Sequence, residues 1–113
     1  MRIWDISPYH LCRSHLLAEH RELHAIWSII TKNKKGYFNH PETKRWKGKL
    51  KALYNRHEEI VNEMKKRKYV HKTPLKLNKA TGKDKQDEFI NPVDKQIIIL
   101  KNKNCDCFKQ KIN

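Results

Sequence analysis

Residues 46–64 read WKGKLKALYNRHEEIVNEM, and this stretch decides the fold. Its apolar positions recur at intervals of four, three, four, three and four residues, which is the repeat of an amphipathic α-helix. The opposite side of the stretch is rich in lysine and arginine. We therefore predict a helix that begins near Pro41 or Glu42 and buries one face in a core. The apolar face consists of Trp46, Leu50, Leu53, His57, Ile60 and Met64.

Two further helices follow from local start signals. The serine–proline pair at residues 7–8 predicts a first helix that runs to about Thr31, because serine caps a helix and proline suits its first turn. The pair Asn91-Pro92 predicts the start of a last helix in the same way. No stretch requires a strand, so we expect an all-α fold: a single domain (1–113) of about three helices joined by long loops. A lysine-rich mobile segment is expected at about 72–88, and a polar tail from about residue 102.

The charge of the chain indicates its class of partner. Lysine and arginine total 26 against 12 acidic residues, a formal net charge of +14 at pH 7. Such a field attracts polyanions, with nucleic acid as the first candidate and an anionic membrane surface as the second. No apolar run approaches the ~20 residues of a membrane span, and the start lacks the apolar core of a signal peptide. We expect a soluble, cytoplasmic protein that associates with the nucleoid and not with a membrane.

Several side chains are candidates for contact with nucleic acid. Tyr37 and Phe38, in a Lys-Lys-Gly loop, are candidates for stacking on bases. Trp27, Trp46 and Tyr54 fall on helical stripes and are predicted to lie in the core. Any one basic residue can instead belong to an ordinary solvated face. The candidate phosphate contacts are Arg13, Arg21, Lys44, Arg45, Lys47, Lys49 and Lys51.

His15, Glu19 and Glu22 share one face of the first helix, because they are four and three residues apart. This face is either a catalytic or ligand-contacting surface or a solvated one whose acids pair with nearby bases. A metal ion bound here would need further ligands that the pattern does not supply.

The other candidate metal ligands are scattered along the chain. The three cysteines, Cys12 and the pair in Cys105-Asp106-Cys107, do not form a disulfide framework, and free thiols are the favoured interpretation. His20 and His24 are four residues apart and could chelate an ion, but the sequence shows no partner set for them. We expect neither a metal ion nor a cofactor.

Three blocks of sequence carry a more specific signal. They are HLLAEHREL at residues 15–23, NHPETKRW at 39–46 and LKALYNRHEEI at 50–60. With these blocks the chain resembles the pyrimidine-dimer DNA glycosylases with apurinic-site lyase activity, the family typified by a small phage endonuclease V. The resemblance is good to about Leu75 and thinner from there to Cys107.

The resemblance implies an enzyme that repairs damaged double-stranded DNA. The α-amine of Met1 would attack C1′ of the damaged nucleotide, the base would leave, and an imine would join protein to DNA. Glu22 would assist proton transfers, and β-elimination would cut the strand. An α-amine suits this role because its ordinary pKa, roughly 7.7–8.0, leaves part of it neutral near pH 7. The catalytic candidates are thus Met1 and Glu22, and the DNA-binding candidates are Arg2, Arg13, His15, Arg21, Lys44, Arg45 and Lys47.

The chain also departs from the phage prototype. Arg2 is expected to block removal of Met1, Ala25 stands where the prototype has an arginine, and the prototype's aromatic carboxyl-terminal segment has no match. These departures concern the lesion that is recognised. We expect a monomer. Two other interpretations stay open: a non-catalytic basic module that binds nucleic acid, and a lyase for abasic sites that acts on another lesion.

Overall fold

The computed structural model describes residues 2–36, 38–71 and 73–108, which form four α-helices and two short 3-10 turns. Within these residues no strand forms, and Lys49 and Gly82 make an isolated antiparallel bridge. The predicted all-α fold is confirmed, and Met1 and Tyr37 lie outside the described residues. In chain order the elements are η1 (Pro8–His10), α1 (Arg13–Thr31), α2 (Pro41–Trp46), α3 (Leu50–Lys66), η2 (Leu77–Lys79) and α4 (Val93–Lys101).

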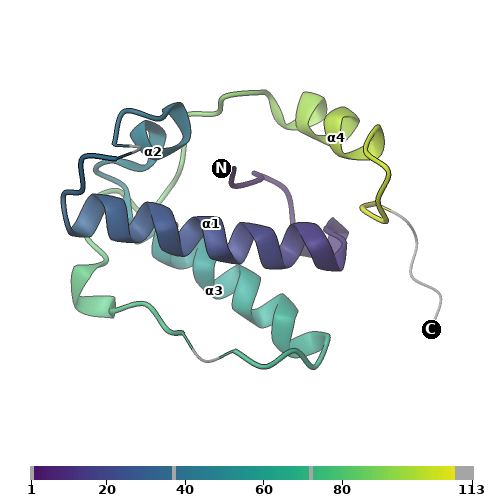
Figure 1. Cartoon of the computed structure of the whole chain (residues 1–113), viewed down its shortest axis with the longest axis horizontal. Helices are drawn as coiled ribbons and strands as arrows, with labels where there is room; N and C mark the ends of the chain where they lie inside the picture. Colours follow the sequence, from purple (N-terminus) through teal and green to yellow (C-terminus); the bar gives the residue numbers. More distant parts are fainter. Residues whose placement is uncertain (1, 37, 72, 109–113) are drawn as a thin grey trace.

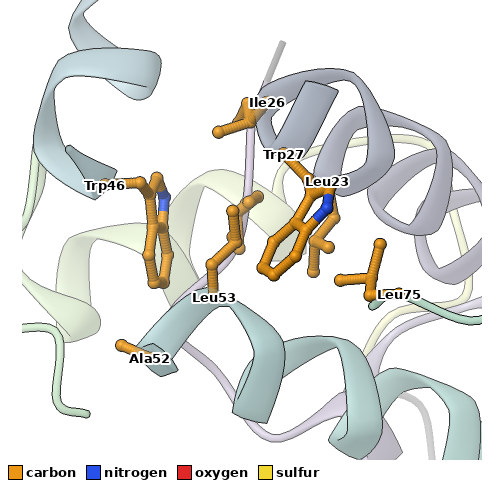
Figure 2. Packing of buried hydrophobic residues seen from close by; sticks show 8 residues of the cluster. Leu23, Ile26, Trp27, Trp46, Ala52, Leu53 and Leu75 are labelled. Carbon is orange, nitrogen blue, oxygen red and sulfur yellow. The ribbon is translucent and has the colours of Figure 1, made fainter. Parts of the chain in front are cut away.

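The main core lies between the two long helices, α1 and α3, which run beside each other (Figure 1). Figure 2 shows the side chains of α1, α2 and α3 meeting around Leu53, which is fully buried. Trp27 and Trp46 are buried as predicted, and Tyr54 is half-buried against the same cluster. The cluster consists of Ile3, Leu23, Ile26, Trp27, Trp46, Ala52, Leu53 and Leu75.

A second cluster joins the two ends of the chain. It packs the N-terminal segment and the start of α1 against the end of α3, α4 and the residues that follow α4. Since its members come from five separate segments, it forms only when the whole chain is folded. The members are Trp4, Ile6, Leu11, Leu16, Ile60, Met64, Leu100 and Cys107.

The first helix begins at Arg13 and not beside Ser7, so the predicted start is wrong. Residues 8–10 form a single 3-10 turn, and Leu11 is extended (φ −82°, ψ 136°) with its side chain fully buried. The carbonyl oxygens of residues 8, 9 and 11 accept hydrogen bonds from the Arg67 guanidinium at 3.2, 3.3 and 2.7 Å. Tertiary contacts from α3 thus replace the helical hydrogen bonds that the local signal favours.

The predicted second helix is in fact two helices, α2 and α3, that meet at a bend. Gly48 lies at the bend with φ +75°, a left-handed conformation that glycine adopts without strain. Gly82 (φ +82°) approaches it so closely that a Cβ at that position would overlap the Gly48 carbonyl oxygen. The break therefore depends on a loop that lies far away in the sequence.

That loop, residues 73–88, falls within the segment predicted to be mobile. The N–H groups of Lys51 and Ala52 donate to the carbonyls of Thr81 and Lys83 at 2.8 and 3.0 Å. The loop thus satisfies N–H groups in the first turn of α3 that have no partner within the helix. Its mobility stays a prediction.

The last helix, α4, begins at Val93, directly after Asn91-Pro92, as predicted. Among the described residues, no helix combines the length and the apolar character needed to cross a bilayer.

Candidate active site

The N-terminal segment, residues 2–5, is held along its backbone. Three consecutive N–H groups each donate to a side-chain oxygen, and the three acceptors come from three different helices. The bonds run from Ile3 to Glu42 Oε1 of α2 (3.1 Å), from Trp4 to Glu19 Oε1 of α1 (2.9 Å) and from Asp5 to Gln96 Oε1 of α4 (2.9 Å).

The segment runs beside α1 in the opposite direction (Figure 1). Trp4 packs in the cluster that contains Leu16, near the start of α1. Ile3, one residue nearer the chain start, packs in the cluster that contains Leu23, further along the helix. Between Trp4 and Ile3 the segment thus advances along α1 toward the turn that contains Glu22.

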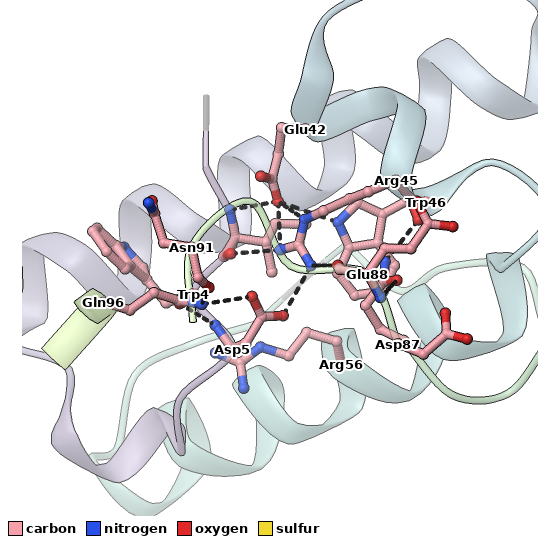
Figure 3. A network of polar contacts seen from close by, with 12 residues as sticks. Trp4, Asp5, Glu42, Arg45, Trp46, Arg56, Asp87, Glu88, Asn91 and Gln96 are labelled. Atoms are coloured by element: carbon pink, nitrogen blue, oxygen red, sulfur yellow. Dashed lines mark hydrogen bonds and ion pairs between the residues drawn. The ribbon is translucent and has the colours of Figure 1, made fainter. Parts of the chain in front are cut away.

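Arg45 is the centre of the network that holds this segment (Figure 3). Its side chain is 5% exposed, and its Nε donates to Glu42 Oε1 at 2.9 Å. Its Nη1 donates to Asp5 Oδ1 and to the Glu88 carbonyl, both at 3.0 Å, and its Nη2 donates to the Ile3 carbonyl at 2.8 Å. Burial acts to lower the pKa of Arg45, but the Glu42 and Asp5 carboxylates raise it above its usual value.

Arg45 is one of the predicted DNA contacts. Because its donors are already bound inside the protein, it is not available to a phosphate in this arrangement. We therefore leave it out of the DNA surface proposed below.

A second buried ion pair lies next to this network. Arg56 of α3 donates through Nε to Glu19 Oε2 at 2.7 Å and through Nη2 to Glu19 Oε1 at 3.2 Å. Glu19 is 1% exposed, so burial raises its pKa, while Arg56 and the Trp4 N–H oppose that rise. The sequence leaves two interpretations for the helix face that contains His15, Glu19 and Glu22: a catalytic surface or acids paired with bases. For Glu19 the structure shows the pairing with a base.

Glu22 lies one helical turn beyond Glu19 and is only half-buried. Within the described residues its carboxylate makes no hydrogen bond or ion pair. Its predicted partner in catalysis, the amine of Met1, lies outside the described residues. The catalytic assignment of both residues therefore stays a prediction.

The remaining predicted DNA contacts differ in accessibility. Arg13, Arg21 and Lys44 are exposed. Arg2 is half-buried, with its guanidinium carbon 4.3 Å from the Trp4 ring centroid. Lys47 is half-buried as well.

Three of these cations meet other side chains. Arg2 Nη2 donates to Asn91 Oδ1 at 2.9 Å. Lys47 Nζ lies 3.2 Å from the ring centroid of Phe38, a predicted stacking residue, and the Arg13 guanidinium carbon lies 5.1 Å from that of Tyr69.

Lys49, also a candidate for phosphate contact, is buried and donates to Gln86, Asp87 and Glu88. The exposed bases of α1 and α2 are thus the most accessible of the candidates, and Arg2 and Lys47 are partly accessible.

A cleft of about 430 Å³ opens beside the N-terminal segment. Trp4 and Asp5 line one side of it, and Arg56 and Glu59 of α3 line another. Of the catalytic and DNA-binding residues predicted from the sequence, none that the structure describes lines this cleft.

Two sets of metal-ligating side chains lie outside the Arg45 network. In the thiol set, Cys12 and His15 meet Cys105 and Cys107. His15, a predicted DNA contact, therefore lies against thiols. No disulfide links the three cysteines, as the free-thiol interpretation predicts.

In the histidine set, His20 and His24 meet His57 and His71. The sequence pairs the first two but not the last two, which lie on α3 and in the segment after it. The sequence gives a signal for one of these two residues: His57 occupies a position on the otherwise apolar stripe of residues 46–64.

Comparison with known protein families identifies the family to which this chain is similar. A model of the family described as pyrimidine dimer DNA glycosylase matches residues 1–77, about two thirds of the chain. No curated protein and no solved structure gives a significant match. The matched range includes α1, α2 and α3 and the three sequence blocks that carry the resemblance. The chain therefore belongs to the pyrimidine dimer DNA glycosylase family.

Proposed function

We propose that this DNA repair glycosylase uses the α-amine of Met1 as its nucleophile and then cuts the resulting abasic strand as a lyase. One observation carries the proposal: three backbone N–H groups, those of residues 3–5, are bound by side chains of α2, α1 and α4, and the α1 acceptor, Glu19, lies one helical turn before Glu22. A backbone bound at three successive residues restricts where the preceding amine can lie. Such restriction is what a nucleophile needs, because reaction requires a defined approach to C1′.

The chemistry proceeds in two stages. In the first, the neutral amine forms a bond to C1′ while the glycosidic bond to the pyrimidine breaks, and the base leaves with the bonding electrons and a proton. The sugar ring then opens, and an imine joins the terminal nitrogen to C1′. In the second, loss of a proton from C2′ breaks the C3′–O bond, which cuts the strand by β-elimination.

Glu22 is the acid that we assign to these proton transfers. Glu19 is engaged by Arg56 and by the Trp4 N–H, so its carboxylate positions the segment and is not free for chemistry. Glu22 lies on the same side of α1, half-buried, with no partner among the described residues. A carboxylate in this state can stabilise a cationic sugar and move protons.

The substrate that we propose is duplex DNA with ultraviolet pyrimidine dimers, met by a monomer inside the cell. The net charge of +14 supports association through phosphate contacts, which weaken steeply as salt rises. Enzymes that act on a base in a duplex generally unstack a nucleotide to reach it. The proposed DNA surface consists of Arg2, Arg13, Arg21, Lys44 and Lys47.

Borohydride trapping tests this proposal. Duplexes with a defined dimer or an abasic site are incubated with the protein, and borohydride reduces any imine to a stable covalent adduct. We expect an adduct whose peptide map assigns the link to the Met1 nitrogen. An adduct at a lysine, or none with either duplex, contradicts the proposal.

Glu22→Gln should lose base excision by about 100-fold or more while its DNA affinity changes little. The matched control is Glu88→Gln, which changes an exposed acid in the loop before α4 and should retain full activity. Full excision by Glu22→Gln contradicts the assignment of this residue.

An extension at the amino terminus separates the proposal from its alternatives. The enzyme should lose strand cutting when the amine is blocked, whereas a non-catalytic DNA-binding module should bind as before. Cutting at abasic sites without excision of dimers would favour a lyase that serves another lesion.

A further inference from the structure

The thiol set unites two distant parts of the chain. Cys12 caps the start of α1 and His15 lies in its first turn, whereas Cys105 and Cys107 follow α4. One ligand atom from each of the four side chains lies within 4.8 Å of all the others. The shortest separations are 3.1 Å from Cys12 Sγ to His15 Nδ1 and 3.2 Å from Cys107 Sγ to the same nitrogen.

These separations suit a tetrahedral zinc site. Zinc binds sulfur at about 2.3 Å and imidazole nitrogen at about 2.0–2.1 Å, so neighbouring ligand atoms lie roughly 3.5–3.8 Å apart. The two shortest printed separations, 3.1 and 3.2 Å, and the limit of 4.8 Å for all pairs are compatible with that spacing. Three sulfurs and one nitrogen are a ligand set that structural zinc sites use, and four protein ligands leave no open position for catalysis.

The distribution of cysteine supports a ligand role. The whole chain contains three cysteines, and all three are in this set. Thiols that only fill space in a core need not gather around one imidazole nitrogen. Their convergence from two ends of the sequence is explained if they bind one ion.

The surrounding backbone supports the same role. The N–H of Cys12 points at Cys107 Sγ, 3.1 Å away, and such a donor stabilises a metal-bound thiolate. The Phe108 N–H donates to the His10 carbonyl at 2.8 Å, and the two rings stack with centroids 4.8 Å apart. These contacts hold the cysteine pair against the start of α1.

We propose that Cys12, His15, Cys105 and Cys107 bind one structural zinc ion that fastens the segment after α4 to the first turn of α1. The ion is held by three deprotonated thiols, so its binding releases protons to solvent. His15 is then a ligand, and its part in DNA binding is to position the start of α1. This site lies beyond the glycosylase chemistry and does not depend on it.

Metal analysis of the protein purified without a histidine tag tests the thiol set. We expect Cys107→Ser to contain one zinc equivalent per chain fewer than the wild type. Ser14→Ala, which changes an exposed side chain in the first turn of α1 outside the set, should keep the wild-type zinc content. Equal zinc content in Cys107→Ser and the wild type overturns the proposal.

Two further measurements distinguish loss of the site from loss of the fold. Cobalt loaded into the wild type should show thiolate-to-metal charge-transfer absorption and the visible bands of tetrahedral coordination. Alkylation of the wild-type cysteines, followed by mass spectrometry, needs no variant: the thiols should react slowly as purified and rapidly after chelation. Equal rates in the two states contradict a bound ion.

The histidine set carries a second, independent inference. His24 Nε2 and His57 Nε2 lie 3.1 Å apart, and the ring centroids of His20 and His24 are 4.6 Å apart. The Nε2 atoms of His20 and His71 are buried and have no hydrogen-bond partner among the described residues. A buried polar atom without a hydrogen-bond partner destabilises the folded state. One ion among the four rings would satisfy both.

One geometric detail favours a metal ion at this place. His57 Nδ1 lies 3.1 Å from Glu58 Oε1, and a carboxylate behind a histidine is a common support for a metal ligand.

We infer that His20, His24, His57 and His71 bind a second divalent transition-metal ion, with zinc as the ion tested. It would join α1 to α3 and to the segment after α3. In Cys107→Ser protein, one zinc equivalent should remain, and adding His71→Gln should remove it. Retention of that equivalent, or an absence of zinc from Cys107→Ser alone, overturns this second inference.

Chemical modification of the wild type needs no variant, so misfolding of a variant does not affect its result. Diethylpyrocarbonate modifies free imidazoles, so the four histidines of the wild type should be protected as purified and modified after chelation. His40, which lies at the N-cap of α2 outside both sets, should react equally in both states and serves as the internal control. Equal modification of the four before and after chelation contradicts the site.

Discussion

Two regions of this molecule bury polar side chains, and they do so in opposite ways. In the network around Arg45, the buried guanidinium meets carboxylates and carbonyls of the same chain. In the histidine set, buried ring nitrogens of His20 and His71 meet no hydrogen-bond partner among the described residues. The difference teaches that the first region is satisfied by the protein's own groups, whereas the second has unsatisfied ring nitrogens that the proposed metal ion would engage.

The largest effect is expected in the Arg45 network. Arg45→Met leaves the Glu42 carboxylate buried and uncompensated, which should lower the free energy of unfolding by about 3–5 kcal/mol. Chemical denaturation measures this change. Lys44→Met, on the same helix but exposed, is the control and should stay within about 0.5 kcal/mol of the wild type. Equal stability of the two variants would mean that the network is not needed for the fold.

The next effect concerns the second ion pair. Glu19→Gln can still accept the Trp4 N–H but no longer neutralises Arg56, so we expect a loss of about 1–3 kcal/mol. Glu59→Gln is the matched control, because Glu59 is 58% exposed and lies 3.4 Å from the same arginine. A larger loss in the control would reverse our assignment of the partner that matters.

Removal of metal should loosen the backbone around the thiol set and leave the N-terminal segment, which the Arg45 network holds, unchanged. After chelation, the amides of Cys12 and Phe108 should exchange hydrogen about tenfold faster, which corresponds to ~1.4 kcal/mol of lost local stability. The amides of residues 3–5 should keep their protection, because their acceptors are side chains of the protein itself. Uniform loss of protection over the whole chain would erase the distinction between the regions.

The smallest effect is expected at Glu22. Since its carboxylate has no partner among the described residues, Glu22→Gln should change the free energy of unfolding by less than about 0.5 kcal/mol. Thermal denaturation next to the excision assay checks this combination of stable fold and lost activity. A strongly destabilised Glu22→Gln would point to a structural role like that of Glu19.

The helices were predictable from sequence where a periodic pattern and a start signal agree. The stripe from Leu50 to Met64 and the start of α4 are examples. The bend at Gly48 was not predictable, because it depends on Gly82, whose close approach no local pattern encodes. The start of α1 was missed for a similar reason, since Arg67 takes the carbonyls that a longer helix would use.

The candidate site was predictable in its residue types more than in their roles. Sequence blocks single out Glu22 and the bases of α1 and α2, and the range that matches the family contains them. The blocks do not show that Arg45 forms ion pairs with Glu42 and Asp5, because folding brings these partners together. The same holds for His57 and His71, which complete a histidine pair that looks incidental in the sequence.

The bond from the Asp5 N–H to Gln96 has a consequence for how the protein is made. The two residues are separated by 91 positions, so during synthesis this bond forms after those from Ile3 and Trp4, whose acceptors come much earlier in the chain. Gln96 also lies outside the range that matches the family. A fragment that ends at residue 77 would carry the family's sequence blocks and keep those two acceptors, but it would lack the acceptor of the Asp5 N–H.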